Sequence, residues 1–320
     1  MGLRMKAPVL SIIVPVKDEE EAIGPFVERV GGVIRSLSDP AAKSFEILFV
    51  DDGSSDDTLN RIKRAHEADD RVRAISFSRN FGKEAALSAG LDEALGQAIV
   101  PMDVDLQDPP EVLGDMIAKW REGFEIVYGV RNDRETDSLP KRLTADLYYR
   151  AHNWMSNDKI PEHAGDFRLL DRKVVDVIRA MPERTRFMKG LFAWAGFRQA
   201  SVSYRREQRQ HGQTKFNYWK LWTFALDGIT SASTAPLRIW SYLGGIVALL
   251  ALFYAIFVTI RTLIFGVQVP GYASLMVAIL FLGGLQLLSL GILGEYVGRI
   301  LVETKHRPLY IVRERIGGGD

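Results

Sequence analysis

Two long apolar runs near the C-terminus constrain the fold of this chain more than any other feature. Residues Ile239–Ile260 carry no charged side chain, and an α-helix of that length spans roughly 33 Å, enough to cross the hydrocarbon core of a bilayer. A second uncharged run ends at Gly294. Pro270-Gly271 interrupt its beginning, so we expect the second span to start near Tyr272. Two buried helices of a soluble protein are the alternative, which consecutive uncharged runs of this length disfavour.

The charged residues around these runs indicate an orientation. The connection between the runs carries only Arg261, whereas the segment after the second run is basic, with Arg299, Lys305, Arg307, Arg313 and Arg315. Because Lys and Arg accumulate on the cytoplasmic side of membrane proteins, this tail is predicted to be cytoplasmic. With two crossings, the N-terminal domain is then cytoplasmic too. Glu295 and Arg299, four residues apart, are expected to form an ion pair at the end of the second span.

The composition excludes several classes of function. The chain of 320 residues has 41 basic and 40 acidic side chains, a balance that argues against nucleic-acid binding through bulk charge. It has no cysteine, which excludes a disulfide framework, thiol catalysis and Cys-ligated zinc or iron–sulfur clusters. The five histidines do not have the spacing of metal ligands.

Strand and helix patterns alternate through the N-terminal half of the chain. We expect strands at Leu10–Val16, Phe45–Val50, Val72–Phe77, Ala98–Met102 and Glu125–Gly129, and helices at Glu21–Leu37, Thr58–Ala68, Lys83–Leu95 and from Pro109-Pro110 onward. Such alternation predicts an α/β domain with a mostly parallel, Rossmann-like sheet and right-handed crossovers. Ligands of such sheets bind at the carboxyl ends of the strands, where this sequence places Asp51, Asp52, Asp103, Asp105 and Arg131.

The acidic loop Asp103-Val104-Asp105 indicates a site for a metal and a diphosphate. A nucleotide-sugar diphosphate leaves poorly unless its charge is neutralised, and a divalent hard cation held by carboxylates neutralises it. The alternative is an ordinary acidic loop in which Asp108 caps the next helix. The turn that begins at Asp51-Asp52 likewise has two interpretations: it caps a helix, or one carboxylate accepts the N–H of a nucleobase.

Three segments together carry a resemblance to a known family. Val14-Pro15-Val16-Lys17-Asp18-Glu19, the Asp51-Asp52-Gly-Ser turn and Asp103-Val-Asp105-Leu-Gln107 resemble the signatures of family 2 inverting glycosyltransferases with the GT-A fold. More narrowly, about the first 220 residues resemble the polyprenyl-phosphate glycosyltransferases, which include dolichol-phosphate mannose synthases, bactoprenol glucosyltransferases and the aminoarabinose transferase of lipid A modification. The two C-terminal spans fit the bactoprenol type. Lys17 and Asp18 stand where the family usually has an aromatic residue and Asn, which leaves the base of the donor open.

The resemblance implies roles for residues of the acidic segments. Pro15, Glu19 and Asp52 would line the nucleotide pocket, and Asp103 would contact the ribose or the diphosphate. Asp105, also expected to be catalytic, and Gln107 would hold Mg²⁺ or Mn²⁺. Lys83 is a candidate nucleotide contact, with a solvated lysine at a helix start as the alternative.

The segment Gly165-Asp166-Phe167-Arg168 resembles the part of the family that supplies the catalytic base. The acceptor implied is a phosphate monoester with a second pKa near 6, which is largely ionised at neutral pH and needs little deprotonation. Three roles are therefore open to Asp166. It acts as the base, it orients the sugar or the phosphate-binding arginines, or it forms a structural pair with Arg168. The sequence leaves these three roles open.

A basic segment before the first apolar run is the candidate acceptor site. Arg209–Phe216 resembles the acceptor loop of these enzymes, and Arg205, Arg209 and Lys215, together with Arg131, are predicted to bind the acceptor phosphate. The alternative is a juxtamembrane cluster that attracts anionic lipid. Phe216–Ile229 has aromatic residues at near-helical spacing and predicts an interfacial amphipathic helix, with a core helix as the alternative.

These observations predict a membrane-bound inverting glycosyltransferase. The expected organisation is a GT-A catalytic domain (1–214), a juxtamembrane helix (215–236), two transmembrane helices (237–296) and a basic tail (297–320). The resemblance implies transfer from a nucleotide-sugar, with UDP-glucose favoured, to undecaprenyl phosphate at the bacterial cytoplasmic membrane, by a homo-oligomer that is expected to be a tetramer. A processive polysaccharide synthase, which would need more spans and a Q-x-x-R-W segment, and a non-catalytic nucleotide-sugar sensor are the rivals.

Overall fold

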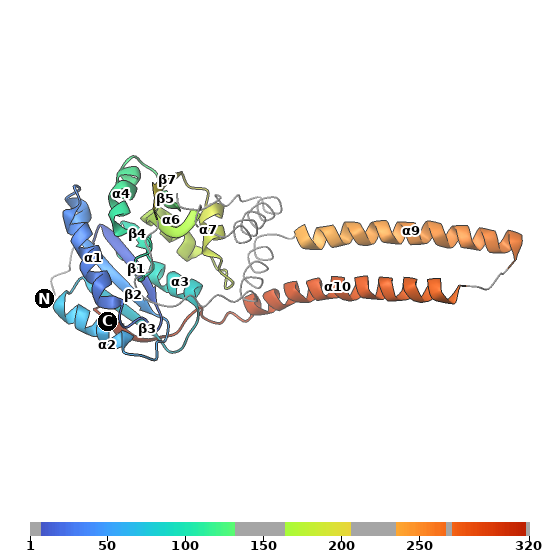
Figure 1. Cartoon of the computed structure of the whole chain (residues 1–320), viewed down its shortest axis with the longest axis horizontal. Coiled ribbons are helices and arrows are strands. Elements are labelled where there is room, and N and C mark those ends of the chain that lie inside the picture. Colours follow the sequence, from blue (N-terminus) through green and yellow to red (C-terminus); the bar gives the residue numbers. More distant parts are fainter. Residues whose placement is uncertain (1–7, 132–163, 206–234, 267–270, 318–320) are drawn as a thin grey trace.

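The computed structural model describes residues 8–131, 164–205, 235–266 and 271–317, which form a layered α/β domain and two long helices that extend from it (Figure 1). The strands are β1 Leu10–Val16, β2 Phe45–Asp51, β3 Val72–Phe77, β4 Ala98–Pro101, β5 Ile126–Arg131, β6 Ala164–Asp171, β7 Gln199–Tyr204 and β8 Val312–Ile316. The helices are α1 Ile23–Ser36, α2 Thr58–Ala68, α3 Lys83–Glu93, α4 Leu113–Arg121, α6 Arg172–Ala180, α7 Met188–Trp194, α9 Ala235–Phe265 and α10 Tyr272–Thr304. Short 3₁₀ turns lie at Ala41–Lys43 and Pro110–Val112, so the helix expected from Pro109-Pro110 begins as a single 3₁₀ turn before α4.

The described strands form one mixed sheet in the order β7-β5-β6-β4-β1-β2-β3-β8. The pairs β1–β2, β1–β4, β2–β3 and β5–β7 are parallel, and β6 is antiparallel to both of its neighbours, β4 and β5. The sequence did not predict β6, which lies between β4 and β5. Because two antiparallel steps restore the direction, β5 still runs the same way as β4. The carboxyl ends of β1, β2, β4, β5 and β7 therefore meet the amino end of β6 at one edge.

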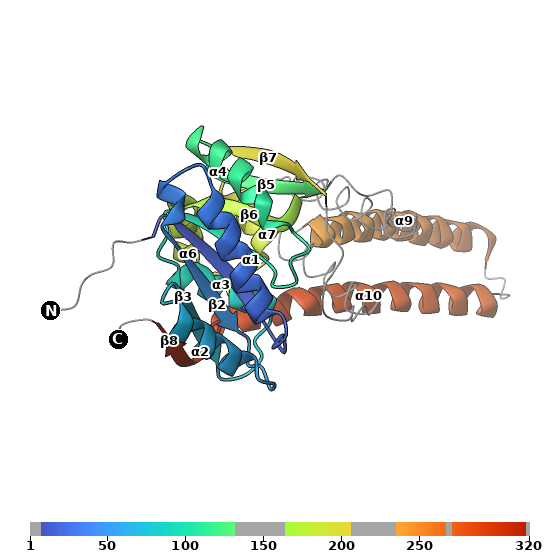
Figure 2. The same ribbon diagram turned by 60° about the vertical axis from the view of Figure 1, so that its left-hand side comes forward.

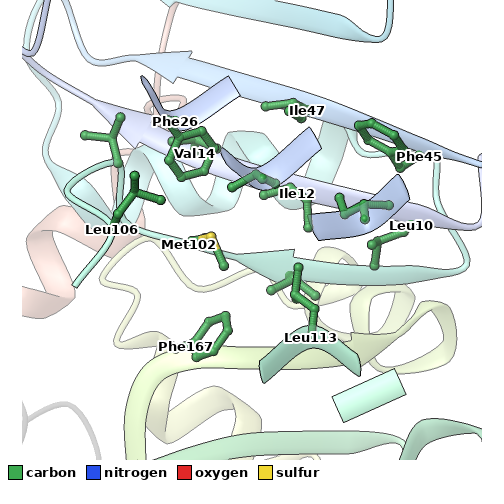
Figure 3. Packing of buried hydrophobic residues seen from close by; sticks show 14 of the residues in the cluster. Leu10, Ile12, Val14, Phe26, Phe45, Ile47, Met102, Leu106, Leu113 and Phe167 are labelled. Carbon is green, nitrogen blue, oxygen red and sulfur yellow. The ribbon is translucent and has the colours of Figure 1, made fainter. Parts of the chain in front are cut away.

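The sheet has a hydrophobic layer on each face. Alternate β1 residues Ile12 and Val14 pack with α1 and α4 on one face, where Phe26 contacts the sheet (Figure 3). Ile13 points to the opposite layer, which α3, α6 and α7 cover. Burial on both faces explains why these strands are continuous Val/Ile runs rather than alternating patterns. At Gly90 a Cβ atom would lie 2.2 Å from Ile13 Cγ2, so this glycine allows α3 to lie unusually close to β1.

The two long helices lie side by side outside the α/β domain (Figures 1 and 2). By length and composition, Tyr242–Phe265 and Leu275–Thr304 can each cross a membrane, and neither segment is buried against the rest of the described protein. Both helices exceed the expected spans, since α9 begins at Ala235 and α10 continues ten residues past Gly294. Polar residues do not end α10 because they pair along it: Arg299 lies 3.0 Å from Glu295, the predicted ion pair.

The C-terminal segment returns to the α/β domain, which the sequence did not indicate. β8 pairs antiparallel with β3 at the sheet edge, and Tyr310 stacks on Phe77 with ring centroids 5.1 Å apart. Arg315 pairs with Glu93 at 3.0 Å, so a residue expected in the basic tail is part of the folded domain. The tail is thus an added strand, which covers an edge that would otherwise be open.

Replacing Phe26 by Ala tests the first hydrophobic layer. Phe26 is fully buried and meets Phe49 edge-to-face with centroids 5.9 Å apart. Phe26→Ala is expected to lower the free energy of unfolding of the α/β domain by about 3–5 kcal/mol, measured by chemical denaturation followed by tryptophan fluorescence. Leu95→Ala is the control, because Leu95 is exposed. Equal unfolding midpoints for the two variants would contradict this packing.

Candidate functional site

A cavity of about 360 Å³ opens at the sheet edge where the strand ends meet. Its lining consists of Pro15, Val16, Lys17, Glu19, Asp52, Asn80, Gly82, Lys83, Ala86, Asp103, Val104 and Asp105. All five residues predicted to bind nucleotide are among them, and so is Asp105. They come from the ends of β1, β2 and β4 and from the start of α3, as the topology of parallel strands requires.

The two aspartates after β2 have different partners. Asp51 is fully buried and accepts hydrogen bonds from Ser76 Oγ at 2.7 Å and Ser54 N at 2.9 Å, which brace the turn internally. Asp52 reaches the cavity and accepts the backbone N–H groups of Phe81 and Gly82 at 2.6 and 2.9 Å. Asp52 therefore fixes the loop that leads into α3. Each carboxylate oxygen has two lone pairs, so Asp52 can still accept a further N–H from a ligand.

Two residues beside the cavity have a strained backbone conformation. Asp18 and Leu106 have φ angles of +53° and +55°, a region that non-glycine residues rarely adopt. Leu106 is buried in the first hydrophobic layer (Figure 3), and this burial holds the strained conformation in place. The turn at Leu106 separates Asp105 from Gln107 and brings the Gln107 N–H to 3.1 Å from Asp105 Oδ1.

The predicted metal ligands fit a hard cation by their chemistry. Gln107 Oε1 is buried and has no hydrogen-bond partner within the described part of the chain, which is costly for a polar atom unless a ligand compensates it. With Asp105 it offers oxygen atoms, the ligands that Mg²⁺ and Mn²⁺ prefer. Among the described residues no group of three or more His, Cys, Asp or Glu side chains converges as a complete metal cage. A cation held here would take further ligands from water or from a bound diphosphate.

Acidic and basic side chains alternate next to the cavity and form what we term the ion-pair chain: Asp103, Lys83, Asp166 and Lys189. Lys83 Nζ lies 2.7 Å from Asp103 Oδ1 and 3.3 Å from Asp166 Oδ2. Lys189 Nζ lies 3.2 Å from Asp166 Oδ1. Lys83, at the start of α3 and 45% exposed, thus has two carboxylate partners. Asp166 has two lysine partners that the sequence did not predict, beside the expected neighbour Arg168, whose guanidinium lies 4.6 Å from the Phe192 ring centroid.

The ion-pair chain shifts the pKa values of its two central members, Lys83 and Asp166. Burial alone raises the pKa of the Asp166 carboxyl, but the charges of Lys189 and Lys83 outweigh burial and hold this pKa well below its usual range. Burial lowers the pKa of the Lys83 ammonium, but Asp103 and Asp166 together raise it above its ordinary value. Both groups are thus fully charged at neutral pH, and Asp166 is a weaker base than an ordinary carboxylate.

A second polar cluster anchors the acidic loop to the far strands. Asp108 is buried, accepts a hydrogen bond from the Tyr204 hydroxyl and lies 3.5 Å from Arg131 Nη2. Arg131 Nε also lies 3.3 Å from the Tyr204 hydroxyl, since Arg131 and Tyr204 face each other in the β5–β7 register. Asp108 is therefore not a simple helix cap. Arg131, predicted to bind phosphate, is not among the residues that line the cavity. Burial lowers the pKa of its guanidinium, but the Tyr204 hydroxyl and the charge of Asp108 outweigh burial and raise this pKa.

Several of the residues predicted to bind the acceptor lie outside the part of the chain that the structure describes. Arg209, Lys215 and the interfacial helix Phe216–Ile229 lie outside the described residues. Arg205 lies at the end of β7, next to Tyr204, and is exposed. Sequence reasoning missed Lys189 and Tyr204. Neither stands in a recognisable motif, and only the tertiary fold brings Lys189 of α7 to Asp166 of β6.

Comparison with known proteins identifies two family models in the chain. The model of glycosyl transferase family 2 matches residues 11–179, and the model of the GtrB C-terminal hairpin matches residues 235–300. The first covers the cavity, the acidic loop and Asp166. The second covers α9 and most of α10, so the pair of long helices is itself a recognised element.

Curated relatives extend along nearly the whole chain. A prophage bactoprenol glucosyl transferase homolog of Escherichia coli is 51% identical over 95% of this chain and 98% of its own. The bactoprenol glucosyl transferase of Shigella phage SfV is 50% identical over 95% and 98%, and an uncharacterized glycosyltransferase of Synechocystis is 52% identical over 96% of both chains. These relatives confirm the resemblance drawn from the three sequence signatures.

Among solved structures, glucosyl-3-phosphoglycerate synthase from Mycobacterium tuberculosis, in complex with Mn²⁺, UDP-glucose and phosphoglyceric acid, aligns with 68% of this chain and 76% of that chain. The identity is 18% and the TM-score 0.46. That likeness is too distant to bear on individual residues of the site.

The depressed pKa of Asp166 predicts how stability depends on pH. A carboxyl whose folded pKa lies below its unfolded value of about 4 contributes stability above that pH and loses it as the pH falls further. The melting temperature of Asp166→Asn is therefore expected to lie below that of the wild type at pH 7, with the difference shrinking below about pH 4. Melting curves from pH 3 to pH 7 measure it. A difference that does not change with pH would contradict the assignment.

Proposed function

Because the chain belongs to glycosyl transferase family 2, we propose that it transfers a sugar from a nucleotide-sugar to a polyprenyl phosphate, with UDP-glucose and undecaprenyl phosphate as the substrates. The observation that carries this proposal is the identity of about one half to bactoprenol glucosyl transferases over nearly the full length of both chains. The mostly parallel sheet, with the acidic loop at its strand ends, agrees with the GT-A fold expected from the sequence.

The proposed membrane arrangement divides the chain into four parts. Residues 1–214 form the cytoplasmic catalytic domain, 215–236 a juxtamembrane helix, 237–296 the two membrane spans and 297–320 a cytoplasmic segment. Pairing of β8 with β3 supports an even number of crossings, because the chain must return to the side on which the catalytic domain lies. The basic residues after the second span support the cytoplasmic side. Two spans make a slim membrane domain, which supports assembly as a homo-oligomer, proposed to be a tetramer.

On the donor side, the cavity takes the nucleotide diphosphate. Pro15, Glu19 and Asp52 line the part assigned to the nucleoside, and Asp103 and Lys83 lie where the ribose and the diphosphate would follow. Asp105 and Gln107 are the proposed ligands of Mg²⁺ or Mn²⁺. When bound, the divalent cation would neutralise the charge that develops on the departing nucleoside diphosphate.

The reaction proposed is a single displacement with inversion. A phosphate oxygen of the acceptor forms a bond to the anomeric carbon while the bond from that carbon to the diphosphate oxygen breaks, and the nucleoside diphosphate leaves with the electron pair. Because the acceptor phosphate is largely dianionic at neutral pH, no proton has to be removed. The lowered pKa of Asp166 supports an orienting role rather than that of a base: its carboxylate holds Lys83 and Lys189. Arg131, Arg205, Arg209 and Lys215 are proposed to bind the acceptor phosphate.

The direct test is product formation by the purified protein in detergent. The protein is incubated with Mn²⁺, undecaprenyl phosphate and a panel of UDP- and GDP-sugars, and lipid-linked sugar is sought by mass spectrometry. A hexosyl lipid formed from one donor is the expected result and names the sugar. Nucleotide release without a lipid product would contradict the proposed acceptor, and absence of turnover with every donor would favour the sensor.

Replacing Asp105 by Asn tests the proposed metal site. Asp105→Asn is expected to lower kcat by about 100-fold or more, because a carboxylate that holds the charge-neutralising cation is lost. Chelation with EDTA is expected to abolish turnover of the wild type, and Mn²⁺ or Mg²⁺ to restore it. Asp115→Asn is the control, since Asp115 lies in α4 away from the cavity. Near-normal metal-dependent activity of Asp105→Asn would refute its assigned role.

A further inference from the structure

The connection between α6 and α7 is attached to the end of membrane helix α10. Glu303 of α10 accepts the backbone N–H of Arg184 at 2.9 Å and that of Thr185 at 2.8 Å. The Arg184 guanidinium in turn donates to the backbone carbonyl of Arg307, just beyond α10. A carboxylate that accepts two backbone N–H groups is a strong, directional attachment, so this connection cannot shift without α10.

The other end of the same connection is fixed to the catalytic domain. Met188, the first residue of α7, donates its N–H to Glu84 Oε2 at 3.2 Å, and Met188 and Phe192 are buried in the second hydrophobic layer. Lys189 follows directly. Its side chain is only 23% exposed and reaches Asp166 from the side opposite Lys83. The position of this ammonium group is therefore set by contacts at both ends of a short segment.

Lys189 lies beyond the donor cavity. Lys83 and Asp103 line the cavity, whereas Asp166 and Lys189 line a small adjoining recess that only Lys83 shares with it. Lys83 thus stands between the two compartments. In both ribbon views α7 lies on the side of the domain from which the long helices extend (Figures 1 and 2). A lipid-borne substrate would approach from that side, and a water-soluble nucleotide would fill the cavity.

We propose that Lys189 binds the phosphate of the polyprenyl phosphate acceptor, and that Glu303 is a positioning residue that holds α7 in place for it. This inference rests on the proposed function and deepens it. An ammonium group has three N–H donors, so Lys189 can bridge Asp166 and a phosphate oxygen. Asp166 then aligns two cations, Lys83 toward the donor diphosphate and Lys189 toward the acceptor. Through Glu303, the membrane helix sets the distance between them.

Replacing Lys189 by Met tests the binding role. Lys189→Met is expected to raise the KM for undecaprenyl phosphate about tenfold, because a charge-assisted contact is lost, and to leave the KM for the nucleotide-sugar unchanged. Lys173→Met is the control, since Lys173 is exposed on α6 outside both compartments. Product formation by the wild type and by Lys173→Met tests the proposed function separately. An unchanged acceptor KM, or an equal rise in the KM of both substrates, would overturn the assignment of Lys189.

A double-mutant cycle tests Glu303. Glu303→Ala is expected to raise the acceptor KM several-fold in the wild type but to add little in the Lys189→Met background, because residues that act through one another are not additive. Glu295→Ala is the control on the same helix, where it removes only the pair with Arg299. Fully additive effects on the acceptor KM, or a change confined to the melting temperature, would show that Glu303 is merely structural and overturn its positioning role.

Discussion

The alternation of charge through Asp103, Lys83, Asp166 and Lys189 is the constraint around which the site is organised. Its pairs lie at 2.7–3.3 Å, yet the Lys83, Asp103 and Asp166 side chains are nearly half exposed. Ion pairs with that much solvent contribute only modestly to stability. Their main effect is therefore on arrangement: each carboxylate holds a lysine at a defined place, and the two lysines keep Asp166 charged. The ionised groups needed for an anionic donor and an anionic acceptor exist before either substrate binds.

The ion-pair chain can form only because β6 is antiparallel to both of its neighbours. In a fully parallel sheet Asp166, at the amino end of its strand, would lie at the edge opposite Asp103. The antiparallel placement of β6 between β4 and β5 instead brings the start of one strand to the ends of the others. The same reversal leaves β5 parallel to β4 in direction, so that Arg131 and Tyr204 reach this edge and fix Asp108 of the acidic loop.

The sequence predicts the part of the site that depends on strand order alone. Asp52, Asp103 and Asp105 follow buried Val/Ile runs, and the rule that parallel strands end at a common edge suffices to bring them together. Lys189 and Tyr204 could not be found in this way, because their partners are far away in the sequence and neither residue stands in a motif. β8 escaped prediction for a related reason: Val312–Ile316 has three consecutive charged residues between two apolar ones, a composition that becomes a strand here because the edge of β3 is available to pair with it.

Helix α10 extends beyond the apolar run that ends at Gly294, and this extension bears on function. Beyond Gly294, α10 continues as a helix stabilised by its own Glu295–Arg299 pair and ends at two contacts with the domain, Glu303 on the α6–α7 connection and β8 on the sheet edge. One contact alone would act as a hinge. Two contacts on different sides of the domain restrict rotation about either, so the orientation of the catalytic edge relative to α10 is fixed. An enzyme that joins a soluble donor to a lipid-borne phosphate needs that orientation, because the acceptor phosphate can move within the membrane plane but must meet the donor held at the catalytic edge.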